Sequence, residues 1–253
     1  WQNRGNAYFN LKQYSEAIRS YDEAIQVYPS WAPPYFSRAN AYYNLKQYER
    51  AIEDYNRTIS RDPDIINAYR YRAQAYKSLG KIEKAIDSLS AAIKFKSLDD
   101  ELFYARGLLY LGQKRYDEAI ADFDKAIALD QDDSHNHASR SVALFGAKRD
   151  AEAVAAVKRA MALAGSKASL RANVLNSVAW ELYEIGLSKK GLPYAEKAIE
   201  LAPEAANILD TRGHIYRVLG RKADAARDFR KALKIRPGIQ SSRDGLAKMG
   251  LAP

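Results

Sequence analysis

Three histidines are the side chains of this chain best suited to acid–base chemistry or metal binding: His135, His137 and His214. A metal site needs two ligands four residues apart on a helix, or two apart on a strand, with a third ligand nearby. His135 and His137 are two residues apart at the expected start of a helix, and His214 is far along the sequence. Their spacing therefore predicts no metal site.

The sequence also lacks the short motifs of common catalytic sites. It contains no His-Glu-x-x-His, no glycine-rich phosphate loop and no Gly-x-Ser-x-Gly turn. The acidic pairs Asp99-Asp100 and Asp132-Asp133 fall in expected turns, where water solvates carboxylates. The absence of cysteine excludes disulfides, thiolate chemistry and cysteine-bound metals. We therefore expect no catalytic residue, no cofactor and no metal.

The composition is that of a folded protein with a basic balance of charge. Hydrophobic residues make up 47% and charged residues 28%, which argues against global disorder. No apolar run reaches the roughly 18 residues of a membrane span, so we expect a soluble protein of the cytoplasm or periplasm. The formal net charge is +9. Because cations alternate with anions, as in residues 49–54, a mixed solvated surface is favoured over nucleic-acid binding.

Small residues recur with a fixed period, which indicates the elements that position these side chains. Segments beginning at Ala32, Ile66, Asp100 and Ser134 follow one another at intervals of 34 residues. Within each segment, positions 8, 20 and 27 are nearly all small. Position 20 holds Ala17, Ala51, Ala85, Ala119, Ala153, Gly191 and Ala225. Small side chains at these positions let two helices approach closely.

Large apolar residues occupy the positions between the small ones. Position 11 holds Tyr8, Tyr42, Tyr76, Tyr110, Leu144, Leu182 and Tyr216. Positions 4, 8 and 11 share one stripe of a first helix, and positions 20, 24 and 27 share a stripe of a second. Proline follows four of the second helices, at Pro29, Pro63, Pro203 and Pro237. Each segment is thus predicted to be a pair of antiparallel helices.

This arrangement resembles the tetratricopeptide repeat family along essentially the whole chain. The matching pattern is clear in Tyr35, Ala39, Tyr42, Ala51 and Pro63. The resemblance implies an all-α, right-handed superhelical solenoid of about seven antiparallel helical hairpins. The expected repeats are residues 1–31, 32–65, 66–99, 100–133, 134–171 with a four-residue insertion, 172–205 and 206–239, followed by a capping helix in 240–253. Because Trp1 falls partway into a repeat, we expect a longer parent chain.

Two places depart from the repeat pattern. The additional residues 168–171 indicate either a first helix about one turn longer or a hinge, and the absence of a helix breaker favours the longer helix. In the second helix of the next repeat, residues 172–205, Gly191-Leu192-Pro193 predicts a late start, because proline is tolerated only in a first turn.

The resemblance implies that the first helices line a concave groove through positions 2, 5, 6, 9, 12 and 13. The residues expected to bind a peptide there are Asn6, Phe36, Asn40, Tyr43, Arg70, Tyr71, Gln74, Tyr104, Leu108, Leu111, Phe145, Trp180, Tyr183, His214 and Arg217. Their amides can pair with both N–H and C=O of a peptide backbone. The lining turns aromatic and apolar from Tyr104 through Phe145 to Trp180. Trp180 has a second interpretation, that it fills space left by small Ala195.

The family's carboxylate clamp for acidic C-terminal peptide tails is disfavoured. Its positions in the first three repeats hold Gln2, Asn6, Ser37, Asn67 and Tyr71, and only Asn6 matches.

Position 7 is arginine in most repeats: Arg4, Arg38, Arg72, Arg106, Arg140 and Arg212. Position 23 of the facing helix is aspartate in three of the same repeats. Antiparallel packing therefore predicts the ion pairs Arg38–Asp54, Arg106–Asp122 and Arg212–Asp228. The alternative is that these arginines only extend over apolar surface to solvent.

These features together predict a binding scaffold rather than an enzyme. The leading hypothesis is that the groove captures an extended or helical segment of another protein or peptide. Single-stranded RNA binding is the first alternative, suggested by the charge and the tyrosines, although related RNA-reading arrays have a unit one residue longer. Self-assembly by end-to-end stacking is the second. Nucleic-acid and membrane partners are not expected.

Overall fold

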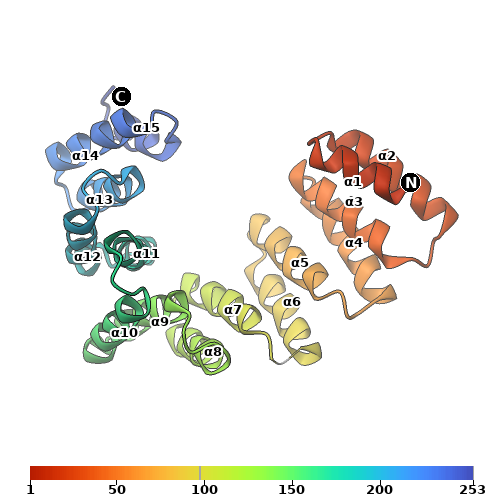
Figure 1. Cartoon of the computed structure of the whole chain (residues 1–253), viewed down its shortest axis with the longest axis horizontal. Helices are drawn as coiled ribbons and strands as arrows, with labels where there is room; N and C mark the ends of the chain where they lie inside the picture. Colours follow the sequence, from red (N-terminus) through yellow and green to blue (C-terminus); the bar gives the residue numbers. More distant parts are fainter. Residues whose placement is uncertain (97, 253) are drawn as a thin grey trace. The chain divides into compact units, whose positions relative to one another are not determined.

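The computed structural model describes residues 1–96 and 98–252, and every regular element within them is a helix (Figure 1). The helices of the N-terminal part are α1 (Gln2–Asn10), α2 (Tyr14–Val27), α3 (Ala32–Asn44), α4 (Tyr48–Arg61), α5 (Ile66–Ser78), α6 (Ile82–Phe95) and α7 (Asp100–Gly112). Those that follow are α8 (Tyr116–Leu129), α9 (Ser134–Gly146), α10 (Asp150–Leu163), α11 (Ala168–Glu184), α12 (Ser188–Leu201), α13 (Ala206–Val218), α14 (Lys222–Ile235) and α15 (Gln240–Ala247). The all-α prediction is confirmed.

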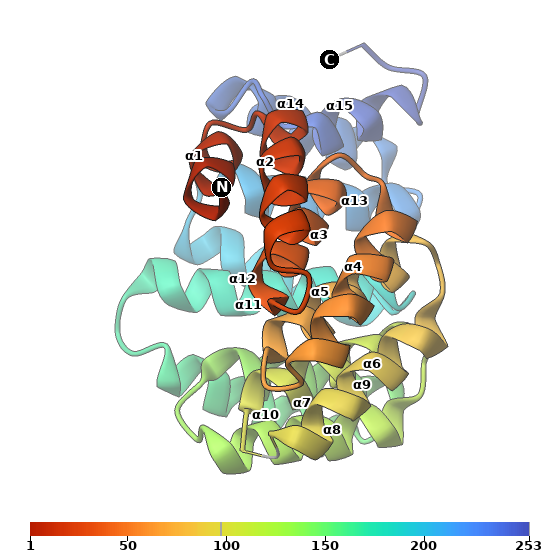
Figure 2. The same cartoon turned by 90° about the vertical axis from the view of Figure 1, so that its right-hand side faces the viewer.

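The chain forms two compact units, Trp1–Leu109 and Tyr110–Pro253, which divide within α7. In the first unit, consecutive helices pack as hairpins: α1 with α2, α3 with α4, and α5 with α6. Neighbouring hairpins meet through α2 and α3 and through α4 and α5, and the first helices α1, α3 and α5 also contact one another in order. Figure 2 shows α3 and α4 lying side by side.

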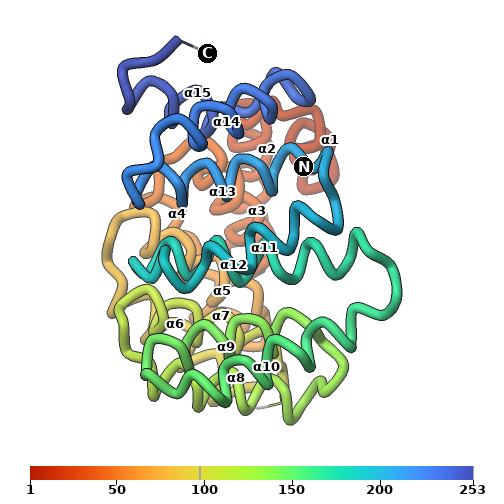
Figure 3. Tube along the Cα trace, turned by 90° about the vertical axis from the view of Figure 1, so that its left-hand side faces the viewer, coloured from red at the N-terminus to blue at the C-terminus, as the bar shows by residue number. Residues whose placement is uncertain are grey.

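The second unit repeats this packing and ends in an additional helix. The hairpins are α9 with α10, α11 with α12, and α13 with α14, and the first helices α9, α11 and α13 contact one another in order. The last helix, α15, packs against both α13 and α14 (Figure 3). Each hairpin thus buries its apolar face against its neighbours, and α15 covers the face that the last hairpin would otherwise expose.

The turn inside each hairpin has one residue in the left-handed region, always at position 15. That residue is Lys12, Lys46, Gly80, Lys114, Lys148, Gly186 or Gly220, with φ between 59° and 87°. The next N–H then donates to the carbonyl five residues back, as from Gln47 to Tyr42 at 2.9 Å. This hydrogen bond closes the C-terminus of the first helix and fixes where the second begins.

The predicted close contacts at small residues are confirmed. A Cβ on Gly5 would lie 2.4 Å from Cε1 of Tyr21, and one on Gly213 would lie 2.7 Å from Cε1 of Phe229. Ala51 is fully buried beside Tyr55. The Tyr21 and Phe229 rings at position 24 therefore lie directly on the position-8 glycine of the facing helix.

The two departures from the pattern have different outcomes. Helix α11 has 17 residues where the other complete first helices have 13, so the predicted additional turn is confirmed. The predicted late start of α12 is wrong, because this helix begins at Ser188 and contains Pro193. Pro193 and Lys189, whose carbonyl loses its helical donor, are both exposed, and Gly191 fills the buried small position.

The expected capping helix is present as α15. Ser241 and Ser242 in its first turn donate hydrogen bonds to the Asp210 carboxylate of α13, at 2.7 and 2.5 Å. Gly245 lies against the Phe229 ring, and Leu246 is fully buried. Within the described residues, no helix combines the length and the apolar character that a membrane crossing requires.

Candidate protein-binding faces

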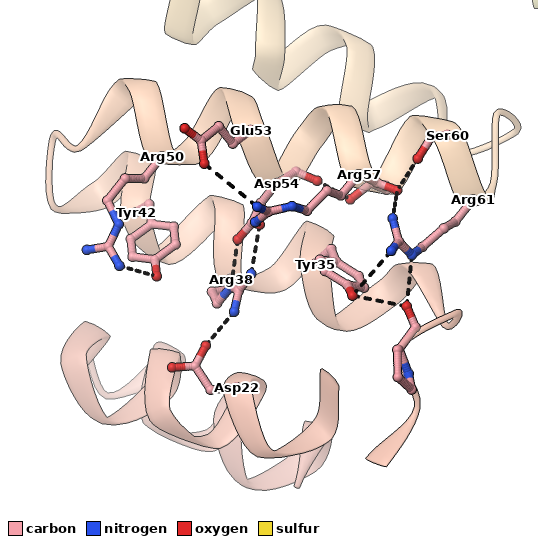
Figure 4. Close-up of polar contacts among 12 residues, drawn as sticks. Asp22, Tyr35, Arg38, Tyr42, Arg50, Glu53, Asp54, Arg57, Ser60 and Arg61 are labelled. Atoms are coloured by element: carbon pink, nitrogen blue, oxygen red, sulfur yellow. Dashed lines mark hydrogen bonds and ion pairs between the residues drawn. The ribbon is translucent and has the colours of Figure 1, made fainter. Parts of the chain in front are cut away.

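Two of the position-7 arginines, Arg38 and Arg212, form the predicted ion pairs within their own hairpins. Arg38 donates through Nε and Nη2 to the two carboxylate oxygens of Asp54, at 2.6 and 2.8 Å (Figure 4). Arg212 contacts Asp228 in the same way, at 2.7 and 3.0 Å. The arginine side chains are only 13% and 16% exposed, so they do not simply extend to solvent. The predicted pair between Arg106 and Asp122 stays a prediction.

The same arginines also bind the preceding hairpin, which the sequence analysis missed. Arg38 reaches Asp22, Arg72 reaches Asn56 at 2.7 Å, and Arg106 reaches Ser90 at 2.8 Å. In the second unit Arg140 reaches Asp124 at 2.5 Å. The partners lie 16 residues before the arginine, just as Asp54 and Asp228 lie 16 residues after it. The sequence signal for these contacts was an arginine with polar residues both 16 positions before it and 16 positions after it.

The charge of the partners determines the pKa of each arginine. Burial alone lowers the pKa of Arg38, but hydrogen bonds to Asp54 and Asp22 outweigh it and raise the pKa. Burial lowers the pKa of Arg72, whose partners Ser88 and Asn56 are neutral. The Arg38 contacts therefore join charged groups across two hairpins, whereas those of Arg72 are ordinary hydrogen bonds.

Aromatic rings gather on the first helices of the first unit. The Phe36 ring lies 5.9 Å from that of Tyr71, which stacks on Tyr55 at 6.2 Å. Tyr55 donates to Oδ1 of Asn40 at 2.7 Å, and Tyr21 donates to Oδ1 of Asn6 at 2.9 Å. These amide oxygens therefore already hold a tyrosine of their own hairpin.

The remaining predicted residues of this unit differ in exposure. Tyr71 is 38% exposed, Asn6 and Gln74 are also exposed, and Tyr43, Tyr104 and Leu108 are half-buried. Arg70 binds Asp99 at 2.8 Å and also Glu101, beside a hollow of about 580 Å³ that Phe36 also lines. Its guanidinium is thus held by acidic residues of its own unit.

In the second unit, the predicted residues of α11 and α13 form one cluster. The Trp180 ring lies 5.2 Å from Tyr183 and 5.8 Å from His214, and Tyr183 lies 5.7 Å from His214. Nη2 of Arg217 reaches the Tyr183 hydroxyl at 3.4 Å, and Nε of Arg217 is buried without a hydrogen-bond partner among the described residues. We call Trp180, Tyr183 and Arg217, which all remain partly exposed, the α11–α13 face.

Three predicted groove residues lie in the core instead. Leu111, Phe145 and His214 are 3%, 5% and 6% exposed. Burial lowers the pKa of His214, and Nε2 of its ring lies 3.7 Å from Oδ1 of Asp210, beyond hydrogen-bond distance. These three side chains are therefore buried rather than open to a ligand.

The surroundings of Ala195 bear on the two interpretations of Trp180. The buried cluster at Ala195 contains Ala179 and Ile215, and the partly buried Leu192 and Tyr194 pack against it. Tyr183 and Leu219 also pack against this cluster, and Trp180 is not among its described members. This packing favours the interpretation in which Trp180 belongs to the exposed surface of the first helices rather than to the core at Ala195.

Glu181 is a buried carboxyl group that the sequence analysis missed. It accepts a hydrogen bond from Ser139 at 3.0 Å, and its Oε2 is buried without a partner. Burial raises the pKa of Glu181 to about 7. The sequence signal was that Glu181 occupies a position that is apolar in the other repeats. Position 10 there holds Ala7, Ala41, Ala75, Leu109, Ala143 and Ile215.

The neighbouring histidines His135 and His137 have local roles at the start of α9. Asp133 accepts a hydrogen bond from the His135 N–H at 2.7 Å as the N-cap of the helix. His137 lies 3.4 Å from the carbonyl of Gln131, and burial lowers its pKa. Among residues 1–96 and 98–252, no three His, Asp or Glu side chains are grouped so as to hold a metal ion.

Comparison with known structures places the fold among bacterial and eukaryotic repeat proteins. A tetratricopeptide repeat protein from Parabacteroides merdae superposes with a TM-score of 0.72 at 19% identity, covering 97% of this chain and 95% of the other. The C-terminal part of a TPR protein from Cytophaga hutchinsonii gives 0.62 at 21% identity, covering 97% and 99%. Yeast Tom70 gives 0.67 at 20% identity, covering 93% of this chain and 51% of Tom70. No curated protein matches by sequence.

Family models match the sequence where the helices pair. A tetratricopeptide repeat model matches residues 1–30, 32–65 and 101–133, a TPR repeat model matches 73–114, and a second tetratricopeptide model matches 206–239. These segments together span more than half of the chain, and the helices within them pack as successive hairpins. The chain therefore belongs to the tetratricopeptide repeat family.

Proposed function

We propose that this protein is a non-catalytic scaffold that binds a segment of another protein on the α11–α13 face. Repeat arrays of this family generally serve protein–protein interaction. The observation that carries the proposal is the combination of Trp180, Tyr183 and Arg217 on two adjacent first helices. Tryptophan, tyrosine and arginine are the residues most enriched among interface hot spots.

The state of Arg217 supports binding of an acceptor group. Among the described residues, its hydrogen bond to the Tyr183 hydroxyl is long, at 3.4 Å, and its buried Nε has no partner. A buried guanidinium N–H without an acceptor is costly. A carboxylate or backbone carbonyl of a partner would pair with the partly exposed guanidinium of Arg217, while the rings of Trp180 and Tyr183 would cover an apolar side chain beside it. The expected ligand therefore combines an apolar residue with a nearby acceptor.

In the first unit, the corresponding groove proposal rests on Phe36, Tyr71 and Gln74. Tyr71 and Gln74 are exposed, and the Phe36 ring packs against Tyr71. Because the oxygens of Asn6 and Asn40 already accept tyrosine hydroxyls, their contribution to a peptide would come through the amide N–H groups.

Selection of a displayed random peptide library on the immobilised full chain tests the proposal. Enriched peptides should pair an aromatic or aliphatic residue with an acidic one. Arg217→Gln should weaken their binding at least about tenfold. The matched control is Arg159→Gln, which removes the same charge from an exposed side chain of α10 and should leave the affinity unchanged.

Two outcomes would overturn this function. One is a selection without enrichment while a labelled oligouridine binds the chain with a steep salt dependence, as expected of an RNA-binding array. The other is equal loss of peptide affinity in Arg217→Gln and Arg159→Gln, which would indicate unspecific attraction to a basic protein.

A further inference from the structure

A second surface lies at the C-terminal end of the chain, along the contact of α14 with α15 (Figure 3). It consists of two hollows that share Arg230, with volumes of about 660 and 420 Å³. Ala226, Met249 and Leu251 line the first, and Leu233 and Pro237 line the second. We call this surface the α14–α15 groove. It lies on a second helix and the capping helix, apart from the first helices of the α11–α13 face.

The charged side chains that line the groove are all cationic. They are Lys222, Arg227, Arg230, Lys234 and Arg243, and no acidic side chain lines either hollow. Among the described residues, Arg227 alone of these five forms an ion pair, with Asp224 at 2.7 Å. Arg230 and Arg243 donate to the carbonyls of Ala252 and Pro237, at 3.3 and 2.7 Å. Most of the positive charge at the groove is therefore not neutralised by acidic side chains of the described residues.

The floor of the groove is apolar and only partly covered. Met249 and Leu233 are half-buried against the cluster of Tyr216, Phe229 and Leu246, and Leu251 is 37% exposed. Apolar side chains surrounded by unpaired cations are complementary to a segment that carries both apolar and acidic residues. A nucleic acid would neutralise the cations but would leave this apolar floor without a matching surface. The combination therefore favours a protein ligand.

We propose that the α14–α15 groove binds an acidic amphipathic helix of a partner protein. The two hollows lie near Ala226 and Leu233 of α14, seven residues apart, which is about 10 Å along a helix. Apolar side chains at positions i and i+7 of a bound helix have the same separation and would reach one hollow each. Acidic residues on the flanks of that helix would then meet Arg230, Lys234 and Arg243.

Fluorescence anisotropy with a defined probe tests this proposal on the full chain. The probe is a labelled peptide with leucines at i, i+3 and i+7 of one helical face and glutamates elsewhere. The double variant Arg230→Glu/Lys234→Glu should raise its Kd at least about tenfold. The matched control, Lys125→Glu/Lys158→Glu, makes the same charge change at exposed positions of α8 and α10 and should raise the Kd less than about twofold.

Further probes separate the apolar from the ionic contribution. Replacing the leucines of the probe by serine should abolish binding, and Met249→Ser in the protein should weaken binding of the parent probe. Circular dichroism melts identify any variant that unfolds, and the serine probe needs no variant at all. The proposal is overturned if the serine peptide binds as tightly as the parent, if both double variants weaken binding equally, or if an oligouridine of equal charge binds at the groove in place of the peptide.

Discussion

Trp180 and Glu181 are neighbours in sequence, yet they take opposite places in the second unit. Trp180 contacts the rings of Tyr183 and His214 and remains partly exposed. The next residue turns inward, so that Glu181 accepts a hydrogen bond from Ser139 and keeps Oε2 buried without a partner. Because a helix rotates by about 100° per residue, Trp180 can lie at the surface while Glu181 points into the core.

Trp180→Phe should weaken binding of peptides selected on the full chain by about 1–2 kcal/mol, with little change in the free energy of unfolding. The reason is that the smaller ring covers less of a bound apolar side chain, whereas Leu192 and Tyr194 already fill the space at Ala195. Titration calorimetry and urea melts measure the two quantities. Lost stability with intact affinity would show that Trp180 is a core residue only.

Glu181→Gln should change how stability depends on pH. Since the folded pKa of about 7 exceeds the ordinary glutamate pKa of 4.5, the native state holds this proton more tightly than the unfolded chain. Wild-type stability should therefore fall as pH rises from about 4.5 to about 7. Above that window the variant should be the more stable, by at most on the order of 3 kcal/mol. Urea melts across this range measure the difference.

The control for this experiment is Glu16→Gln, which changes an exposed glutamate of α2 and should not alter the profile. A Glu181→Gln variant whose stability runs parallel to wild type from acid to neutral pH would contradict the buried, protonated carboxyl.

At the scale of helices, four position-7 arginines, Arg38, Arg72, Arg106 and Arg140, connect their hairpin to the one before it. Arg38 on α3 binds Asp54 on α4 and Asp22 on α2 (Figure 4). Asp54 is fully buried and also accepts from Arg57 at 2.7 Å. Arg72 makes the same connections with the neutral Ser88 and Asn56.

Arg38→Met and Arg72→Met should therefore differ in cost. The first leaves the buried Asp54 with Arg57 alone and should destabilise the protein by about 3 kcal/mol. The second leaves only neutral groups without a donor and should cost about 1–2 kcal/mol. Thermal or urea unfolding of the two variants provides the comparison, and each is the control for the other. Equal losses would mean that the charge of the pair adds nothing.

The helices could be predicted from the sequence because every hairpin repeats the same small and large positions. The additional turn of α11 and the capping helix also followed from local residues. The start of α12 did not, because the rule against an internal proline ignores that Pro193 faces water. The hydrogen bonds to the preceding hairpin were missed because the arginine is at position 7 of its repeat, so a partner 16 residues earlier belongs to the repeat before it.

The candidate site was harder to predict than the helices. Phe145 and His214 occupy groove positions in their repeats but are buried. A periodic pattern identifies the stripe of a first helix, but it does not separate the part that touches the next first helix from the part that faces solvent. That division depends on side-chain size in neighbouring repeats, as in the ring cluster of Trp180, Tyr183 and His214.

For the molecule as a whole, the formal net charge of +9 has a partly local origin. In the described part of the second unit, the α14–α15 groove gathers five cations without a lining acid. The α11–α13 face instead carries rings around one guanidinium. Two surfaces of such different chemistry would bind different segments, and variants at one should leave ligands of the other unaffected.

Hydrogen–deuterium exchange of the full chain, with and without a peptide selected on it, tests the proposed function most directly. Binding on the α11–α13 face should slow amide exchange in α11 and α13, because a bound segment suppresses the local opening of these helices. Arg217→Gln should abolish this protection at the same peptide concentration. Protection confined to second helices such as α12 and α14, or saturating binding without protection of α11 and α13, would contradict the proposed function.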